Sequence, residues 1–122
     1  MGADLAYIGS PFIATDEANA QPDYKRMIVD SGAMDIVTTS LFTGVSGNYL
    51  AQSIRNSGLD PDNLDRADAS SMNFGMTSVK AWSQIWGAGQ GIGAVHDVVP
   101  AGALVDRLAG EYAAARAAVA AM

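Results

Sequence analysis

The chain has 122 residues, of which 49% are hydrophobic, and carries a formal net charge of −6 at pH 7. This length allows one modest core, the acidic charge argues against a nucleic-acid surface, and the absence of cysteine excludes disulfides, thiolate metal sites and cysteine nucleophiles. No apolar run reaches the roughly 18 to 20 residues that span a bilayer, and no secretory signal opens the chain, so we expect a soluble, cytoplasmic protein that binds neither nucleic acid nor membrane.

The first predicted element is a short strand over residues 5–8, LAYI, which ends at Gly9, Ser10 and Pro11. A turn made of glycine and serine lets backbone N–H groups approach a phosphate closely. The N-terminus of a following helix adds about half a positive charge. The sequence therefore predicts an anion site at this turn.

Two helices are predicted next. Thr15 is a cap residue with Asp16 and Glu17 in the first turn of a short helix. Pro22 then stands at the start of a second helix over residues 23–30, and Gly32 is expected to be its C-cap.

The middle of the chain predicts one strand and one more helix. A β-branched run favours a strand over residues 34–40. Leu50 and Ile54 lie four residues apart, which favours a helix over residues 48–57 that Gly58 closes. Residues 59–76 show no periodicity and read as a loop.

The last part predicts two helices around a glycine cluster. Val79, Trp82, Ile85 and Trp86 share one helical face of residues 78–86. Pro100 opens the longest predicted helix, with an apolar stripe. That stripe consists of Leu104, Val105, Leu108, Tyr112, Ala115 and Val119.

The glycine cluster between these helices fits a dinucleotide-binding pattern only loosely. Gly89, Gly91 and Ala94 match G-x-G-x-x-G/A, but no buried strand precedes them and no helix opens on them. The interpretation favoured here is a loop whose backbone passes close to a ligand or another chain segment, with Gln90 as an amide donor and acceptor. A plain flexible connection is the alternative.

Other polar and aromatic residues are assigned no chemistry. His96 beside Asp97 lacks the partners of a catalytic pair. The spacing of four aspartates, Asp60, Asp62, Asp65 and Asp68, lacks the glycine and terminal glutamate of a calcium loop. Trp82 and Trp86 fit packing better than stacking on a planar cofactor.

Four blocks in order, GADLAYIGSPFIATDEANA, YKRMIVDS, DIVTTSLFTGVSGNYL and IWGAGQGIGAV, resemble the C-terminal portion of nitronate monooxygenases, formerly called 2-nitropropane dioxygenases. The resemblance implies an α/β fold, the C-terminal fragment of a TIM (β/α)8 barrel of the FMN-dependent type with appended helices. Residues 3–19 would be the last barrel strand and phosphate turn, 20–76 a helical and loop insertion, 77–99 a glycine segment near the flavin, and 100–122 a C-terminal helix.

The resemblance also implies a cofactor site. Tyr7, Ile8, Gly9 and Ser10 would border FMN, mainly through backbone groups, and Gln90 is a weaker candidate. Ser10 replaces the frequent threonine of the family, and Pro11 stands where many members carry arginine, which removes a backbone donor and a cation.

No catalytic or metal-binding residue is expected in this chain. The resemblance places the catalytic histidine and earlier flavin-contacting loops of the family upstream of these blocks, so the chain is expected to be a fragment that is inactive by itself. The complete enzyme would oxidise alkyl nitronates with O2. An FMN-dependent enoyl or quinone reductase of the same barrel class, or a non-catalytic interaction module, is the alternative.

Overall fold

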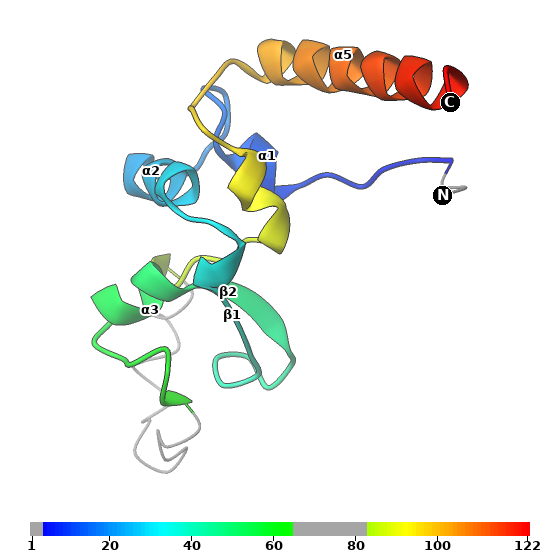
Figure 1. The fold of residues 1–122 in the computed structure, drawn as a ribbon. Helices are drawn as coiled ribbons and strands as arrows, with labels where there is room; N and C mark the ends of the chain where they lie inside the picture. The colour runs from blue at the N-terminus through cyan, green and yellow to red at the C-terminus, as the bar shows by residue number, and fades with distance from the viewer. Residues whose placement is uncertain (1–3, 65–82) are drawn as a thin grey trace.

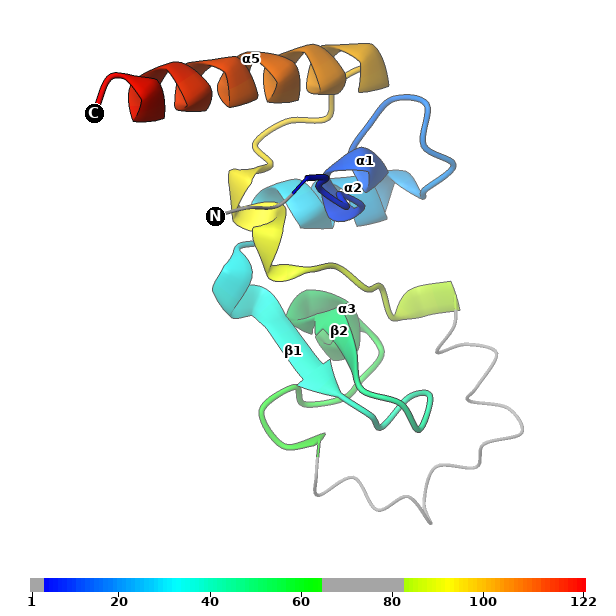
Figure 2. The same ribbon diagram turned by 90° about the vertical axis from the view of Figure 1, so that its right-hand side faces the viewer.

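A computed structural model describes residues 4–64 and 83–122 of the chain. The described residues form a small mixed α/β structure with a two-stranded sheet (Figures 1 and 2). The elements in chain order are α1 (Ser10–Ile13), α2 (Pro22–Asp30), the 3-10 turn η1 (Ala33–Asp35), β1 (Ile36–Thr39), β2 (Gly47–Leu50), α3 (Ala51–Asn56), the 3-10 turn η3 (Gln90–Ala94) and α5 (Ala101–Ala120).

The sheet is antiparallel, with Ile36 opposite Leu50 and Thr39 opposite Gly47. The other edge of β2 is partly covered by residues 86–88. The Leu50 N–H donates to the Trp86 carbonyl at 2.8 Å, and the Ala88 N–H donates to the Asn48 carbonyl at 3.3 Å. Residues far apart in the sequence therefore meet beside β2.

Close backbone approach explains one of the glycines in the cluster. Gly87 forms an isolated antiparallel bridge with Tyr49. A Cβ atom at Gly87 would lie 3.1 Å from the Asn48 carbonyl oxygen. The prediction that this loop passes close to another chain segment is therefore confirmed at Gly87.

Two small hydrophobic clusters lie on either side of residues 86–87. The first consists of Ala14, Ile28, Leu50, Ala88, Ile92 and Val95, and the second consists of Ile54, Leu64 and Ile85. The first cluster holds α1, α2 and η3 together, and the second lies under α3. Burial is thus concentrated where residues 86–95 cross the remaining elements.

Several predicted elements are confirmed. The helix opened by Pro22, the strand within residues 34–40, and the long helix after Pro100 are α2, β1 and α5. Gly58 closes α3 with a φ of +87°, a conformation that favours glycine.

Other predictions are wrong in position. No helix follows Thr15; the short helix is α1, which ends before Thr15. Residues 48–50 belong to β2, so the helix expected over residues 48–57 begins only at Ala51. Gly32 is not a left-handed cap: its φ is −123°, and its N–H donates to the Asp35 carboxylate at 2.8 Å.

The predicted strand over residues 5–8 is not formed. These residues belong to no sheet, and the segment extends away from the other elements (Figure 1). Leu5 is 93% exposed and Tyr7 is fully exposed. A strand requires a neighbouring strand for its hydrogen bonds, and no described residue pairs with this segment.

Helix α5 is joined to the rest by its first turn. The Glu17 carboxylate accepts the Ala101 N–H at 2.8 Å, and Leu104 is buried. Beyond that turn α5 runs as a separate helix above the other elements in both views, and its C-terminal end extends past α1 and α2 (Figures 1 and 2). Within the described part of the chain, no helix is long and apolar enough to cross a membrane.

Candidate functional site

The turn at Ser10 and the glycine segment, both singled out in the sequence, are in direct contact. The Ser10 hydroxyl oxygen accepts the Gly89 N–H at 2.8 Å, across 79 residues of sequence. Ser10 is the first residue of α1, and Gly89 immediately precedes η3. The fold therefore brings Gly9, Ser10 and the backbone of the glycine segment to one place.

The face of this turn is open. Gly9 is exposed, and a Cβ atom there would meet no heavy atom within 4 Å. Because the Ser10 hydroxyl accepts the Gly89 N–H through its oxygen, its own O–H remains able to donate. An anion such as a phosphate could be contacted at this turn by that O–H, while Pro11 has no N–H and the Phe12 N–H already donates to the Gly9 carbonyl at 3.0 Å.

The helix dipole contributes little at this turn. Helix α1 has four residues, with proline in its first turn. The half charge expected from a helix N-terminus requires several aligned peptide units, and proline supplies no N–H. The contact is therefore a small site with one hydroxyl donor and no cation at Pro11.

Tyr7 and Ile8 do not join this arrangement. Tyr7 is fully exposed and Ile8 is 40% exposed, and both lie on the segment that leaves the other elements (Figure 1). The structure thus brings together Gly9, Ser10 and the Gly89–Gln90 backbone but leaves the two side chains before them apart.

Gln90 belongs to a chain of exposed polar side chains on three elements. Its Oε1 atom accepts a hydrogen from Asn48 Nδ2 at 3.4 Å, and Asn48 Oδ1 accepts the Thr38 hydroxyl at 2.6 Å. Thr38 and Asn48 carry no local sequence signal of this contact, because it depends on the pairing of β1 with β2 and on the position of η3.

An aromatic hollow lies next to the Ser10 turn. It has a volume of about 580 Å³, and its lining includes Gly9, Phe12, Tyr24 and Trp86. The Tyr24 and Trp86 rings stack with centroids 5.0 Å apart, and the Tyr24 hydroxyl donates to the Gly87 carbonyl. Burial raises the pKa of the Tyr24 phenol. The stacked pair shows that Trp86 packs against a neighbouring ring, as predicted. Trp82 lies outside the described residues.

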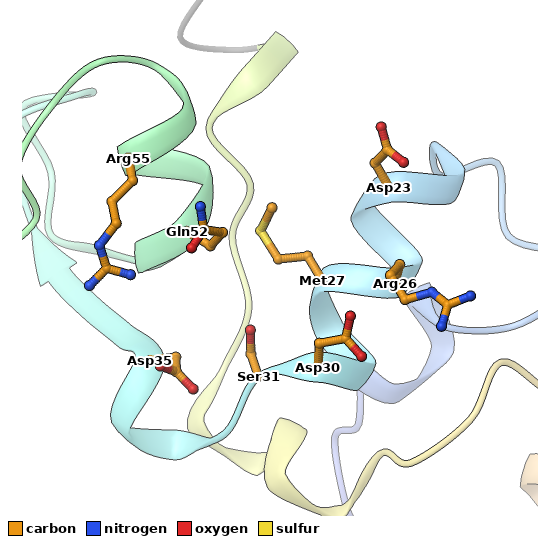
Figure 3. A pocket seen from close by; sticks show the side chains of 8 residues that line it. All are labelled: Asp23, Arg26, Met27, Asp30, Ser31, Asp35, Gln52 and Arg55. Carbon is orange, nitrogen blue, oxygen red and sulfur yellow. The ribbon is translucent and has the colours of Figure 1, made fainter.

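A second pocket, of about 290 Å³, lies between α2 and α3 (Figure 3). Met27 extends from α2 toward α3, where Gln52 lies, while the Arg26 guanidinium points away from α3. Its lining mixes both charges, from Asp23, Arg26, Asp30, Asp35 and Arg55. These charged side chains are solvent-exposed, so the pocket has no desolvated group that could fix a ligand.

The remaining polar residues considered in the sequence form no catalytic or metal-binding cluster in the described part of the chain. His96 and Asp97 are both exposed. The Asn63 amide and the Asp62 N–H donate to the Asp60 carboxylate and lower its pKa, as in an ordinary loop turn. Asp65 and Asp68 fall outside the described residues. In residues 4–64 and 83–122, no group of three or more acidic or histidine side chains could hold a metal ion.

Comparisons with known proteins add no relative to this picture: no family model, no curated protein and no solved structure matches the chain.

Proposed function

We propose that this chain is the C-terminal part of an FMN-dependent oxidoreductase of the nitronate monooxygenase type, and that it supplies part of the FMN phosphate site. The complete enzyme would act on alkyl nitronates and O2 in the cytoplasm. The flavin, when bound, supplies the electron chemistry. The residues of this chain bind and orient the phosphate.

One observation carries the proposal: the hydrogen bond between the Ser10 hydroxyl and the Gly89 N–H. It joins the two blocks on which the family resemblance depends most, GSPFIAT and AGQGIG. The contact holds the Ser10 oxygen in place while its O–H remains available as a donor. A Cβ atom at Gly9 would meet no heavy atom within 4 Å, so the turn leaves room beside Ser10 for a phosphate oxygen.

The exposed N-terminal segment supports the barrel assignment. Leu5, Tyr7 and Ile8 present unburied apolar side chains on a segment with no strand partner in the described structure. In a barrel, the apolar side chains of a strand are usually buried between the barrel interior and the surrounding helices. We assign residues 4–9 as a last strand that pairs with strands from the rest of the enzyme.

A binding experiment tests the phosphate site directly. We expect FMN to bind the purified chain saturably, with quenching of flavin fluorescence, and riboflavin to bind at least about tenfold more weakly, because it lacks the phosphate that the site recognises. Inorganic phosphate should compete with FMN. Equal affinities for FMN and riboflavin, or a folded chain without saturable binding, would contradict the proposal.

Two substitutions at one position separate the hydroxyl from the fold. Ser10→Ala removes the donor, and we expect about a tenfold loss of FMN affinity. Ser10→Thr keeps the hydroxyl and should bind FMN as the parent chain does. Ser46→Ala, on an exposed loop far along the chain, is the matched control. Equal loss in the Ala and Thr variants would show that packing, not the hydroxyl, is responsible.

The alternatives share part of this prediction. An enoyl or quinone reductase of the same barrel class would bind FMN at the same turn, so only turnover by the reconstituted enzyme distinguishes the substrates. A non-catalytic interaction module would not prefer FMN to riboflavin. The exposed apolar side chains of α5 are the observation that favours the module.

A further inference from the structure

Helix α5 carries large apolar side chains on one side at heptad spacing. With Val105 at an a position, the a and d positions of α5 fall on Val105, Leu108, Tyr112, Ala115 and Val119. Alternating steps of three and four residues place all five along one seam of a helix. The charged residues of α5, Asp106, Arg107, Glu111 and Arg116, all lie outside these positions.

Most of this seam is uncovered in the structure, although Leu108 is half-buried. Val105 is 51% exposed, Tyr112 is 65% exposed and Val119 is 72% exposed. Only Leu104, near the start of the helix, is buried against the other elements. A helix in a folded protein gains most of its stability from packing an apolar face against other elements, and most of the 20 residues of α5 lack such packing.

The charges beside the seam match a second copy of the same helix. In this register Glu111 is a g position and Arg116 is the e position of the next heptad. In a parallel pair of helices, each g residue faces the e residue five positions further along the partner. Glu111 of each copy would then face Arg116 of the other, giving two opposite-charge pairs by symmetry.

The intrahelical contacts already orient these two side chains along the helix surface. Arg107 Nε lies 3.5 Å from Glu111 Oε1, and the Arg116 guanidinium lies 5.8 Å from the centre of the Tyr112 ring. Arg116 thus flanks the seam residue Tyr112. An antiparallel pair would bring like flanks together and would offer no Glu–Arg match, so the charges select the parallel arrangement.

We propose that α5 is a homodimerisation helix that pairs in parallel with α5 of a second copy of this chain. The proposal is independent of FMN binding, because it concerns a helix that lies apart from the Ser10 turn (Figures 1 and 2). Neither the mass of the chain in solution nor the pairing of α5 depends on whether the barrel assignment is correct.

Sedimentation equilibrium of the full chain tests the pairing. We expect the mass to rise with concentration from 12.6 kDa toward twice that value. Tyr112→Glu places a charge on the seam and should raise the dimer dissociation constant at least about tenfold. Ala113→Glu adds the same charge at the neighbouring position outside the seam and should leave it unchanged. A monomer at all concentrations, or equal effects of the two variants, would overturn the proposal.

Charge exchange tests the choice of partner. Glu111→Arg leaves two cations facing each other in a homodimer, and Arg116→Glu leaves two anions, so each variant should dimerise more weakly than the parent chain. Mixed together, the two variants restore both opposite-charge pairs and should form the heterodimer in preference to either homodimer. A statistical mixture of species would contradict the Glu111–Arg116 pairing.

The cysteine-free sequence permits a direct test of orientation. Val119→Cys introduces one thiol at an a position near the end of α5. In a parallel pair the two thiols face each other, and mild oxidation should give a disulfide-linked dimer in high yield. Ala113→Cys, outside the seam, is the control. Equal yields from both variants, or a larger aggregate whose size Tyr112→Glu does not change, would refute a parallel pair.

Discussion

The buried hydroxyl of Ser53 connects three parts of the fold and offers a sharp test of how they are held together. Ser53 lies in α3 and is fully buried. Its hydroxyl donates to the Leu50 carbonyl at 2.8 Å and accepts the Trp86 N–H at 3.0 Å. One atom thus joins the end of β2, the start of α3 and the segment that covers the second edge of β2.

Replacing Ser53 with alanine removes both hydrogen bonds and leaves the Trp86 N–H without its partner. A net hydrogen bond contributes about 1 kcal/mol, and a buried donor left unsatisfied costs about 1–3 kcal/mol. The better helix propensity of alanine returns about 0.5 kcal/mol. We therefore expect Ser53→Ala to lower the free energy of unfolding by about 2 kcal/mol, equivalent to a fall in Tm of roughly 8 °C for a chain of this size.

Urea denaturation followed by far-ultraviolet circular dichroism measures this change. Ser57→Ala is the matched control, because Ser57 is exposed and its hydroxyl makes a single local hydrogen bond to the Ile54 carbonyl at 2.7 Å. We expect that control to cost no more than about 0.5–1 kcal/mol. If the two variants unfold within about 0.5 kcal/mol of each other, the Ser53 hydroxyl does not hold the junction.

Three further predictions concern other contacts of the fold. The Ala101 N–H lowers the pKa of the Glu17 carboxyl below its usual 4.5. The ionised Glu17 therefore stabilises the fold above that value, and this stabilisation is lost as pH falls through the folded-state pKa. In circular dichroism, Glu17→Gln should not show this loss of helix in acid. Burial raises the pKa of the Tyr24 phenol above its usual 10.0. The neutral phenol therefore stabilises the fold below that value, and this stabilisation is lost as pH rises through the folded-state pKa. In urea denaturation at increasing pH, Tyr24→Phe should not show this alkaline loss of stability. Ile28 is fully buried in the first cluster, and calorimetry of Ile28→Ala should show a loss of about 2–5 kcal/mol.

Each of these predictions has a matched comparison. Asp97→Asn and Tyr7→Phe make corresponding changes on exposed side chains outside α5. An acid transition that is the same in the Glu17 and Asp97 variants would contradict the role of the Ala101 contact. An alkaline step that survives Tyr24→Phe would exclude the buried phenol as its source. Ile28→Val should cost only about 1 kcal/mol, and a loss equal to that of alanine would argue against a tightly packed site.

Local sequence signals predicted the elements whose conformation is set within the segment itself. Proline at the start of α2, the β-branched run of β1 and the positive φ of Gly58 all act over a few residues. The start of α5 after Pro100 belongs with them. In each case the residue that signals the element also constrains its backbone.

The predictions failed where a distant segment decides the conformation. The four-residue spacing of Leu50 and Ile54 predicts a helix, yet Leu50 is extended because β2 pairs with β1 and with Trp86. Periodicity within a window carries no information on such pairing. The opposite error occurs at residues 5–8, where strand-forming residues have no pairing partner in the described structure.

In the candidate site, too, the sequence predicts individual residues, whereas the contacts between them depend on the fold. The sequence singled out Ser10 and the glycine segment, but their contact spans 79 residues and only the fold shows it. The polar chain from Thr38 to Gln90 went unnoticed because it depends on the register between β1 and β2 and on where η3 crosses them.

The contacts that hold the Ser10 region impose an order on biosynthesis. Ser10 is held by Gly89, and Ala14 and Asp16 exchange backbone hydrogen bonds with Val99. Closing loops of this length costs about 4 kcal/mol of chain entropy. Residues 89–99 are synthesised after residues 10–16, so the turn at Ser10 and the backbone at Ala14 and Asp16 reach their partners only once the ribosome has passed Val99.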